Sequence, residues 1–205
     1  MKKFIIINLL FLILLLILGI ISLKAGPVKI TFKEIIDLIK GINKDTNIRI
    51  IIFEIRLPRL ILAFVTGAAL TVAGLVFQVI LRNPLAEPYI LGVSSGGALG
   101  AIIALSIGIA VVPVFSFLGA LLTIILVYKI AQVHEHTSSL NLILAGVIVN
   151  AFFSSLVMLL TSLLKGASFK GIIFWLMGSI DCVSYDGLIL ISILVFIGII
   201  FIYLK

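Results

Sequence analysis

The sequence predicts an all-α integral membrane protein with about six transmembrane helices. Hydrophobic residues make up 63% of the chain and charged residues only 11%, whereas an ordinary soluble domain has about 45–50% and about 25%. The apolar residues also fall into runs of about 20, which is the length that a helix needs to cross about 30 Å of hydrocarbon. Membrane lipid is therefore the expected surroundings of most of the chain.

The elements can be placed in order along the chain. The N-terminal apolar run to Leu23 could be a signal peptide, but it has no A-x-A cleavage site, which favours a retained first helix. In the polar segment that follows, apolar residues within Ile30–Lys40 recur near helical period and predict a short amphipathic helix at the membrane interface. Pro58 fits the first turn of the next helix, where its missing N–H costs nothing. The expected spans are residues 4–23, 58–81, 89–109, 111–133, 140–164 and 186–204, with an outer interfacial segment at 24–57 and a half-helix near 172–178.

No internal repeat or low-complexity linker interrupts this order, so residues 1–205 are expected to form a single transmembrane domain. The net charge is +7, but Lys and Arg lie between the apolar runs and form no basic face interleaved with aromatics. Nucleic acid is therefore not an expected partner.

Catalytic and metal-binding patterns are weak. Cys182 is the single cysteine and has no thiol partner, and His134 and His136 flank Glu135 at a spacing that is poor for a metal site. The carboxylates lie almost wholly in loops, and no Ser-His-Asp or H-E-x-x-H arrangement is present. The sequence predicts no catalytic residue, no metal ligand and no cofactor.

The basic residues give an ambiguous orientation. With Lys2 and Lys3 on the inside, five of the 15 basic residues would lie inside and ten outside. This distribution is the reverse of the positive-inside rule. Either the rule fails here, or the outer charges have a function.

Two of the expected helices have small and polar residues along one face. The spacings are 4, 4, 3 and 4 residues in the second helix and 4, 4 and 7 in the fifth, so each set forms a stripe. Such a stripe allows close helix packing or lines a polar path. Gln78 favours the path, because an amide that faces lipid is costly, whereas an interhelical hydrogen bond is an equal alternative for Asn150. The stripes consist of Ala63, Gly67, Thr71, Gly74 and Gln78, and of Gly146, Asn150, Ser154 and Thr161.

A proline-containing loop and a glycine-serine helix start lie between the second and third expected helices. The loop is Asn83-Pro-Leu-Ala-Glu-Pro88, and the helix start is Gly92-Val-Ser-Ser-Gly-Gly-Ala98, which includes Ser94, Ser95 and Gly96. Irregular backbone at membrane depth is tolerated only where protein or water satisfies it. A glycine-rich helix start can bind phosphate, but no G-x-x-x-x-G-K-[ST] motif is present, so nucleotide binding is not expected.

Arg56 and Arg59 lie about one turn apart, just before a helix enters the membrane. They are either interfacial arginines that extend to water or a pair that binds carboxylates of a partner. Their spacing alone does not separate these alternatives.

Taken together, several motifs closely resemble the FecCD-type permeases, the membrane subunits of ABC importers for iron-siderophores, haem and cobalamin. In the family's order they are Arg56-Leu-Pro-Arg59, the Gly67/Gly74 helix that ends in Gln78, Asn83-Pro-Leu-Ala-Glu-Pro88, Leu91-Gly-Val-Ser-Ser-Gly96, Leu144-Ala-Gly146 and Trp175-Leu-Met-Gly-Ser179. The run from Arg56 to Gly96 is highly specific. The resemblance implies the first six helices of the ten-helix BtuC-like permease fold, in the cytoplasmic membrane.

The resemblance also implies partners and residue roles. Such a permease works as a homodimer or with a second permease half, together with cytoplasmic ATPase subunits and an external substrate-binding protein, and it binds no nucleotide itself. By position, Arg56 and Arg59 match arginines that meet glutamates of the binding protein. Asn83, Pro84 and Leu85 match an inner loop that narrows the pore, while helices two and five line the path. The N-terminus is expected inside.

The chain is shorter than the family pattern, which leaves its activity open. It stops at Lys205, before the cytoplasmic coupling segment and the later G-F-V-G-L-x-x-P-H-type motif. The leading hypothesis is the N-terminal portion of a permease whose other half is encoded separately or lost. The alternatives are a six-helix substrate-capture subunit of a vitamin importer, which the run from Arg56 to Gly96 disfavours, and an inactive remnant.

Overall fold

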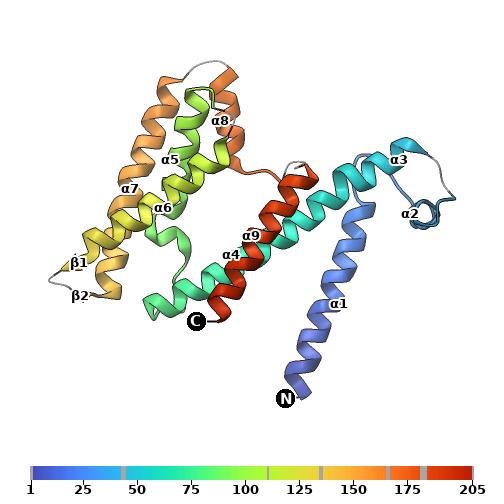
Figure 1. The fold of residues 1–205 in the computed structure, drawn as a ribbon, viewed down its shortest axis with the longest axis horizontal. Coiled ribbons are helices and arrows are strands. Elements are labelled where there is room, and N and C mark those ends of the chain that lie inside the picture. The colour runs from blue at the N-terminus through green and yellow to red at the C-terminus, as the bar shows by residue number, and fades with distance from the viewer. Residues whose placement is uncertain are drawn as a thin grey trace. The chain divides into compact units, whose positions relative to one another are not determined.

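The computed structural model describes residues 2–42, 45–109, 111–133, 136–164, 167–180 and 184–204. Within them the regular structure is helical apart from one short antiparallel hairpin (Figure 1). Internal contacts divide the chain into two compact units: unit 1 contains residues 1–69 and 180–205, and unit 2 contains residues 70–179. Helix α4 (Leu57–Leu81) runs from the first unit into the second. The expected all-α membrane fold is confirmed, while the single-domain expectation stays a prediction.

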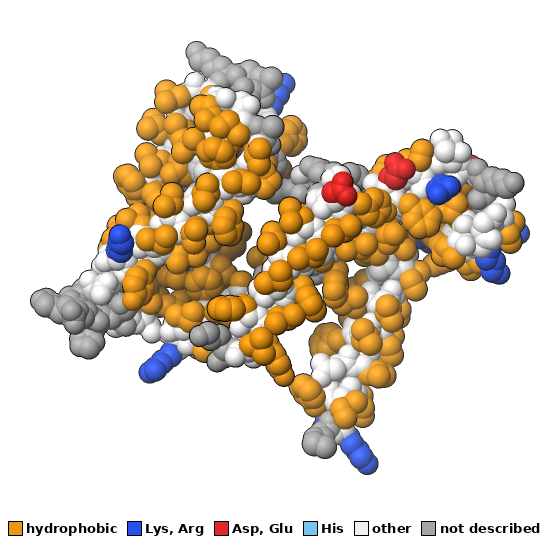
Figure 2. Space-filling model, in the orientation of Figure 1, with side chains coloured by type: hydrophobic (Ala, Val, Ile, Leu, Met, Phe, Trp, Pro, Cys, Tyr) orange, Lys and Arg blue, Asp and Glu red, His pale blue; other side chains and the backbone are white. Residues whose placement is uncertain are grey.

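Unit 1 begins with α1 (Lys2–Lys24), a helix that is apolar on every face. None of its residues is buried, and its large apolar side chains from Phe4 to Ile21 are 44–72% exposed. A helix that is hydrophobic all round needs lipid or further helices as its surroundings. Figure 2 shows the same character on the other long helices, where hydrophobic side chains cover most of the visible surface.

The polar segment after α1 contains the amphipathic helix that the sequence predicts. This helix, α2 (Phe32–Ile39), lies within the expected range 30–40, so its existence is confirmed. Thr31 and Glu34 form a capping box: the Glu34 N–H donates to Thr31 Oγ1 at 3.3 Å, and the Thr31 N–H donates to the Glu34 carboxylate at 2.7 Å. A capping box satisfies two backbone donors and thereby fixes where the helix begins.

The second expected span differs from the structure at its start. An uninterrupted helical run extends from Thr46 to Leu81 and consists of α3 (Thr46–Ile50), a π-helical turn η1 (Ile51–Arg56) and α4. Asp45 caps its beginning by accepting from the Asn47 N–H at 2.9 Å. Pro58 therefore lies inside the run and not in its first turn.

The π-helical turn explains how the helix continues through a proline. Proline lacks an N–H and normally breaks the ladder of hydrogen bonds four residues apart. The Leu57 N–H already donates to the Ile52 carbonyl, five residues back, so the ladder has shifted to the π spacing before Pro58 is reached. At that spacing the Phe53 carbonyl would need an N–H from Pro58. It accepts instead from the Tyr185 hydroxyl, at the start of α9 (Tyr185–Tyr203).

Unit 2 is a group of helices around a small apolar core. It contains the 3₁₀ turn η2 (Pro88–Leu91), α5 (Val93–Ser106), α6 (Val112–Ala131), the paired strands β1 (Gln132–Val133) and β2 (His136–Thr137), α7 (Ser139–Leu163) and α8 (Ala167–Met177). Helices α5, α6 and α7 lie side by side (Figure 1). The buried core consists of Leu91, Val127, Ala131, Ala145 and Val149, so it joins η2, α6 and α7.

Glycines allow α5 and α6 to lie in direct backbone contact. A Cβ atom at Gly96 would lie 2.8 Å from the Gly119 carbonyl oxygen, and one at Gly100 would lie 2.9 Å from the Phe115 carbonyl carbon. The Thr123 side chain is fully buried beside them, and its hydroxyl donates to the Gly119 carbonyl at 2.7 Å. Small residues at a helix contact are the common means of close packing in membranes.

The remaining expected spans agree with the structure except for the third. Among the described residues, five helical segments are long and apolar enough to cross a membrane: α1, the Thr46–Leu81 run, α6, α7 and α9. Residues 89–109 instead form η2 and the 14-residue α5, separated at Gly92, whose φ of +71° is left-handed. At 1.5 Å per residue α5 measures about 21 Å, less than the roughly 30 Å of hydrocarbon. Seven residues of α5 are buried, so protein covers much of it.

The half-helix expected near 172–178 is present as α8. Among the described residues, no group of three His, Cys, Asp or Glu side chains gathers that could hold a metal ion. His134, Glu135 and Cys182 lie outside the described residues.

Candidate functional site

The stripe of the second expected helix lies along α4. Ala63, Gly67 and Thr71 are exposed, while Gly74 and Gln78 are half-buried. A Cβ atom at Gly67 or Gly74 would meet no described neighbour within 4 Å. The glycines of this stripe therefore do not serve close packing within this part of the chain. Their place on a translocation path stays a prediction.

The stripe of small and polar residues in the fifth expected helix lies along α7, and its members differ in burial. Gly146 is buried, Asn150 and Thr161 are half-buried, and Ser154 is exposed. The Thr161 hydroxyl donates to the Val157 carbonyl of its own helix at 2.9 Å. Ser154 and, in part, Asn150 and Thr161 are accessible to a substrate on this face of α7, whereas Gly146 is not.

The structure brings Gly146 and Asn150 against the junction of η2 and α5. A Cβ atom at Gly146 would lie 2.8 Å from Leu91 Cα, and one at Gly92 would lie 3.2 Å from the Asn150 backbone nitrogen. Gly146 therefore has a packing role, because a larger side chain would push η2 away from α7. Gly92, Gly146 and Asn150 are the predicted site residues that the fold places together.

The glycine-serine motif builds the start of α5. Gly92 takes the left-handed conformation before the helix, and its carbonyl accepts from the Gly96 N–H at 3.0 Å and from the Ser95 hydroxyl at 2.9 Å. Gly92, Ser95 and Gly96 are buried, while Ser94 is exposed. The motif thus shapes the backbone, and Ser94 is its accessible member.

The loop after α4 is an ordered turn that presents one apolar side chain. The Leu85 N–H donates to Asn83 Oδ1 at 2.9 Å, and the Ala86 N–H donates to the Asn83 carbonyl at 3.0 Å. Pro84, between them, is exposed. Leu81 and Ala86 are each only 2% exposed on either side of the turn, whereas Leu85 is 84% exposed. This geometry fixes Leu85 outward, where it can close against another surface.

The two arginines of the outer edge have different surroundings. The Arg56 guanidinium donates to the carbonyls of Leu23 at 2.7 Å, Lys24 at 3.0 Å and Val28 at 2.6 Å, while Arg59 is exposed. The last carbonyls of a helix have no partner within it, and a basic side chain stabilises them. Arg56 therefore closes the end of α1, a role that neither alternative drawn from the sequence includes.

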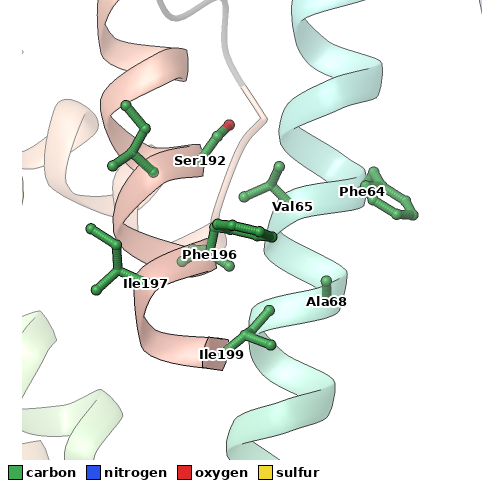
Figure 3. A pocket seen from close by; sticks show the side chains of 9 residues that line it. Phe64, Val65, Ala68, Ser192, Phe196, Ile197 and Ile199 are labelled. Carbon is green, nitrogen blue, oxygen red and sulfur yellow. The ribbon is translucent and has the colours of Figure 1, made fainter. Parts of the chain in front are cut away.

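An apolar cavity of about 420 Å³ separates α4 from α9 (Figure 3). Phe196 extends from α9 toward α4 and lies near Val65. The single hydroxyl of the lining, that of Ser192, donates to the Leu188 carbonyl of its own helix at 2.7 Å. The cavity fits hydrocarbon and not a polar ligand. It is lined by Phe64, Val65, Ala68, Ser192, Ile193, Val195, Phe196, Ile197 and Ile199.

Known proteins are similar to this chain in sequence and in fold. A model of the FecCD transport family matches residues 14–205. The chain belongs to the FecCD transport family. A solved structure described as an inward-facing conformation of a metal-chelate type ABC transporter matches with a TM-score of 0.71 and 33% identity, covering 87% of this chain and 53% of that chain.

Two relatives illustrate the range of the FecCD family. The iron-uptake system permease protein FeuC of Bacillus subtilis is 32% identical over 158 residues, which cover 70% of this chain and 46% of FeuC. The cobalamin import system permease protein BtuC of Halobacterium salinarum is 43% identical over 104 residues, which cover 49% of this chain and 28% of BtuC. The chain spans less than half the length of these relatives.

Family membership makes this FecCD chain a multi-pass membrane protein of the permease class, not a catalytic subunit.

Sequence reasoning missed two residues of this chain, Tyr185 and Gly26, which contact residues far away in the sequence. A Cβ atom at Gly26 would lie 2.6 Å from Arg56 Nη2. It also missed Thr123, although Gly119 one turn earlier was a usable signal of close helix packing.

Proposed function

We propose that this chain forms the N-terminal part of the membrane pore of an ABC importer for an iron chelate or cobalamin. The observation that carries the proposal is the FecCD match over residues 14–205. The match of 87% of the chain to a metal-chelate type transporter supports it. The relatives named above carry iron and cobalamin in their names, so the proposal extends to this class of large metal complexes and not to one compound.

The proposal includes partners. They are cytoplasmic ATPase subunits, an external substrate-binding protein, and either a second copy of this chain or a second permease half. The exposed faces of α1 and the apolar cavity beside α4 and α9 support further helices at these surfaces, because apolar cavities weaken packing unless something fills them.

For the path we propose the α4 stripe from Ala63 to Gln78 together with Asn150 and Ser154 of α7. Small residues with few strong ligands suit a bulky chelate, which must enter and leave without tight binding. Leu85 is proposed as the inner gate, since the Asn83 turn holds its side chain outward.

For the outer edge we propose that Arg59 binds a carboxylate of the binding protein while Arg56 keeps the end of α1 in place. With a cytoplasmic N-terminus, most of the basic residues lie outside. Complementary charge there would steer an acidic partner and fix its orientation.

The proposal is tested by uptake in a transport-deficient strain. The chain is expressed with its ATPase, the binding protein and its permease partner, and uptake of a labelled ferric siderophore, haem and cobalamin is measured. We expect uptake of one of them only when every component is present. Failure of all three substrates with a complete, co-purifying assembly would overturn the proposal, as would tight binding of a vitamin by the chain alone.

A further inference from the structure

The exposed face of α2 is apolar, although α2 lies in the most polar segment of the chain. Phe32, Ile36 and Ile39 occupy positions i, i+4 and i+7, which form one helix face, and they are 47%, 49% and 72% exposed. Ile35 and Leu38 are half-buried, so α2 packs on its own chain through a neighbouring face. The stripe of Phe32, Ile36 and Ile39 is left exposed by the part of the chain that the structure describes.

Lysines border this stripe. Lys33 and Lys40 are exposed, and they lie one turn before and one turn after Ile36. The Lys24 Nζ lies 4.8 Å from the centre of the Phe32 ring, so a third ammonium group reaches the stripe from the end of α1. Two positive charges thus lie along one side of the exposed apolar stripe, and a third lies at its Phe32 end.

The acidic residues of α2 lie on the far side of the lysines. Glu34 and Asp37 are three residues apart and share a face that does not include the stripe. Around the helix the order is apolar, basic and then acidic. A helix lying in a membrane interface has its apolar face in the acyl boundary, its lysines at the phosphates and its acids in water.

The depth of α2 follows from its connections. Residues 25–31 join it to α1, and the Arg56 guanidinium holds the Leu23 and Val28 carbonyls together. Ile30, just before α2, is 1% exposed. The apolar α1 ends here and the apolar α4 begins here. If both helices cross the membrane, α2 lies near the level where the hydrocarbon ends.

We propose that Lys24, Lys33 and Lys40 bind the phosphate group of an anionic phospholipid, whose acyl chains contact Phe32, Ile36 and Ile39. The negative charge of the lipid complements the lysines, and the neighbouring helix α1 exposes apolar side chains on every face. Each lysine should raise the preference for anionic over zwitterionic lipid about fivefold. This site is independent of the proposed transport function.

The test places a spin label at Ile36 or, as a matched control, at Asp37, in the full chain carrying Cys182→Ser. The protein is reconstituted in nanodiscs of phosphatidylcholine with or without phosphatidylglycerol, and collisions of the label with oxygen and with a soluble nickel chelate are measured. We expect the label at Ile36 to favour oxygen severalfold more than the label at Asp37, and phosphatidylglycerol to increase this difference. Lys33→Gln with Lys40→Gln should greatly reduce the effect of phosphatidylglycerol and leave only the part that Lys24 contributes, while Lys2→Gln with Lys3→Gln should leave it unchanged.

Three results would overturn the proposal. The label at Ile36 could be as exposed to nickel as the one at Asp37 in both lipids. Soluble glycerol phosphate could produce the same shift without phosphatidylglycerol, which would indicate an anion site and no lipid site. The label could become shielded only after an external binding protein is added, which would indicate a protein surface. If the double glutamine variant does not fold, native mass spectrometry of the unmodified chain decides, with preferential retention of phosphatidylglycerol expected and equal loss of both lipids contradicting the proposal.

Discussion

The Arg56 guanidinium occupies a place where water alone would otherwise satisfy backbone carbonyls. Three carbonyls at and after the end of α1 accept its hydrogen bonds, and the chain approaches so closely that Gly26 leaves no room for a side chain. A hydrogen bond from a charged donor contributes about 1.5–3 kcal/mol to stability. One side chain thus joins the end of α1 to the start of the Thr46–Leu81 run.

We predict that Arg56→Gln lowers the stability of unit 1 by about 1–3 kcal/mol, because a shorter neutral amide cannot reach all three carbonyls. Gly26→Ala should act in the same direction, since its Cβ displaces the guanidinium. Arg49→Gln, on the exposed side of α3, is the matched control. Thermal unfolding in detergent measures the effect, and equal unfolding temperatures for the Arg56 and Arg49 variants would contradict it.

A second prediction concerns Glu34 and acid. Hydrogen bonds from the Thr31 hydroxyl and then from the Thr31 N–H lower the pKa of the Glu34 carboxyl below its ordinary value of 4.5. A lowered folded pKa means that the stabilisation is fully present above the ordinary pKa and is lost as the pH falls through the lowered value. Hydrogen exchange of the α2 amides should therefore accelerate as the pH falls below about 4.5, after correction for intrinsic rates. Glu34→Gln keeps an acceptor but cannot titrate, so its α2 exchange should show no such step.

At the scale of elements, the contact between α5 and α6 depends on the absence of side chains. Gly100→Ala places a methyl group on the Phe115 carbonyl, which belongs to rigid helix backbone. We predict a loss of about 1–3 kcal/mol in stability, the range for overpacking a well-packed contact. Gly198→Ala in α9 meets no described neighbour within 4 Å and should be neutral or slightly stabilising. Thermal unfolding of both variants in detergent tests this, and similar unfolding temperatures would contradict it.

The sequence predicts the elements well where the lipid alone determines them. The runs that became α1, α6, α7 and α9 need only enough apolar length, and α2 needs only its periodicity. The start of the second span could not be predicted in this way, because the π-helical turn removes the usual penalty of Pro58 and depends on Tyr185, far away in the chain. The break at Gly92 in the third span depends likewise on packing against α7.

The candidate site is predictable only in part for the same reason. Spacing identified the stripes, but it could not show that Gly146 is buried against η2, while a Cβ atom added at Gly67 or Gly74 of α4 would meet no described neighbour within 4 Å. Nor could it show that the Arg56 guanidinium donates to carbonyls at and after the end of α1, since those groups lie at least 28 residues away in sequence. For Leu85, in contrast, contacts within the neighbouring sequence are sufficient, because the turn formed by Asn83 holds its side chain outward.

For the whole molecule, the helices define which segments share a side of the membrane. One crossing by α1 and one by the Thr46–Leu81 run should place Lys3 and Leu85 on the same side, and α2 on the other. We predict that cysteines at positions 3 and 85, in a Cys182→Ser background, react with an impermeant maleimide only in inside-out vesicles. A cysteine at Lys40 should react only in right-side-out vesicles. The opposite pattern would reverse the proposed orientation, and reaction of positions 3 and 85 from different sides would contradict the spans themselves.

The hydrogen bond between Tyr185 and the Phe53 carbonyl has a consequence for biosynthesis. The two residues are 132 positions apart, so at common rates of translation the carbonyl is made on the order of ten seconds before its hydroxyl donor. During that interval the run through Pro58 must leave the carbonyl to water or to the translocation machinery. The π-helical turn can therefore reach its final hydrogen-bonded state only when α9 has been inserted, which makes the junction at the start of α4 one of the last parts of unit 1 to be completed.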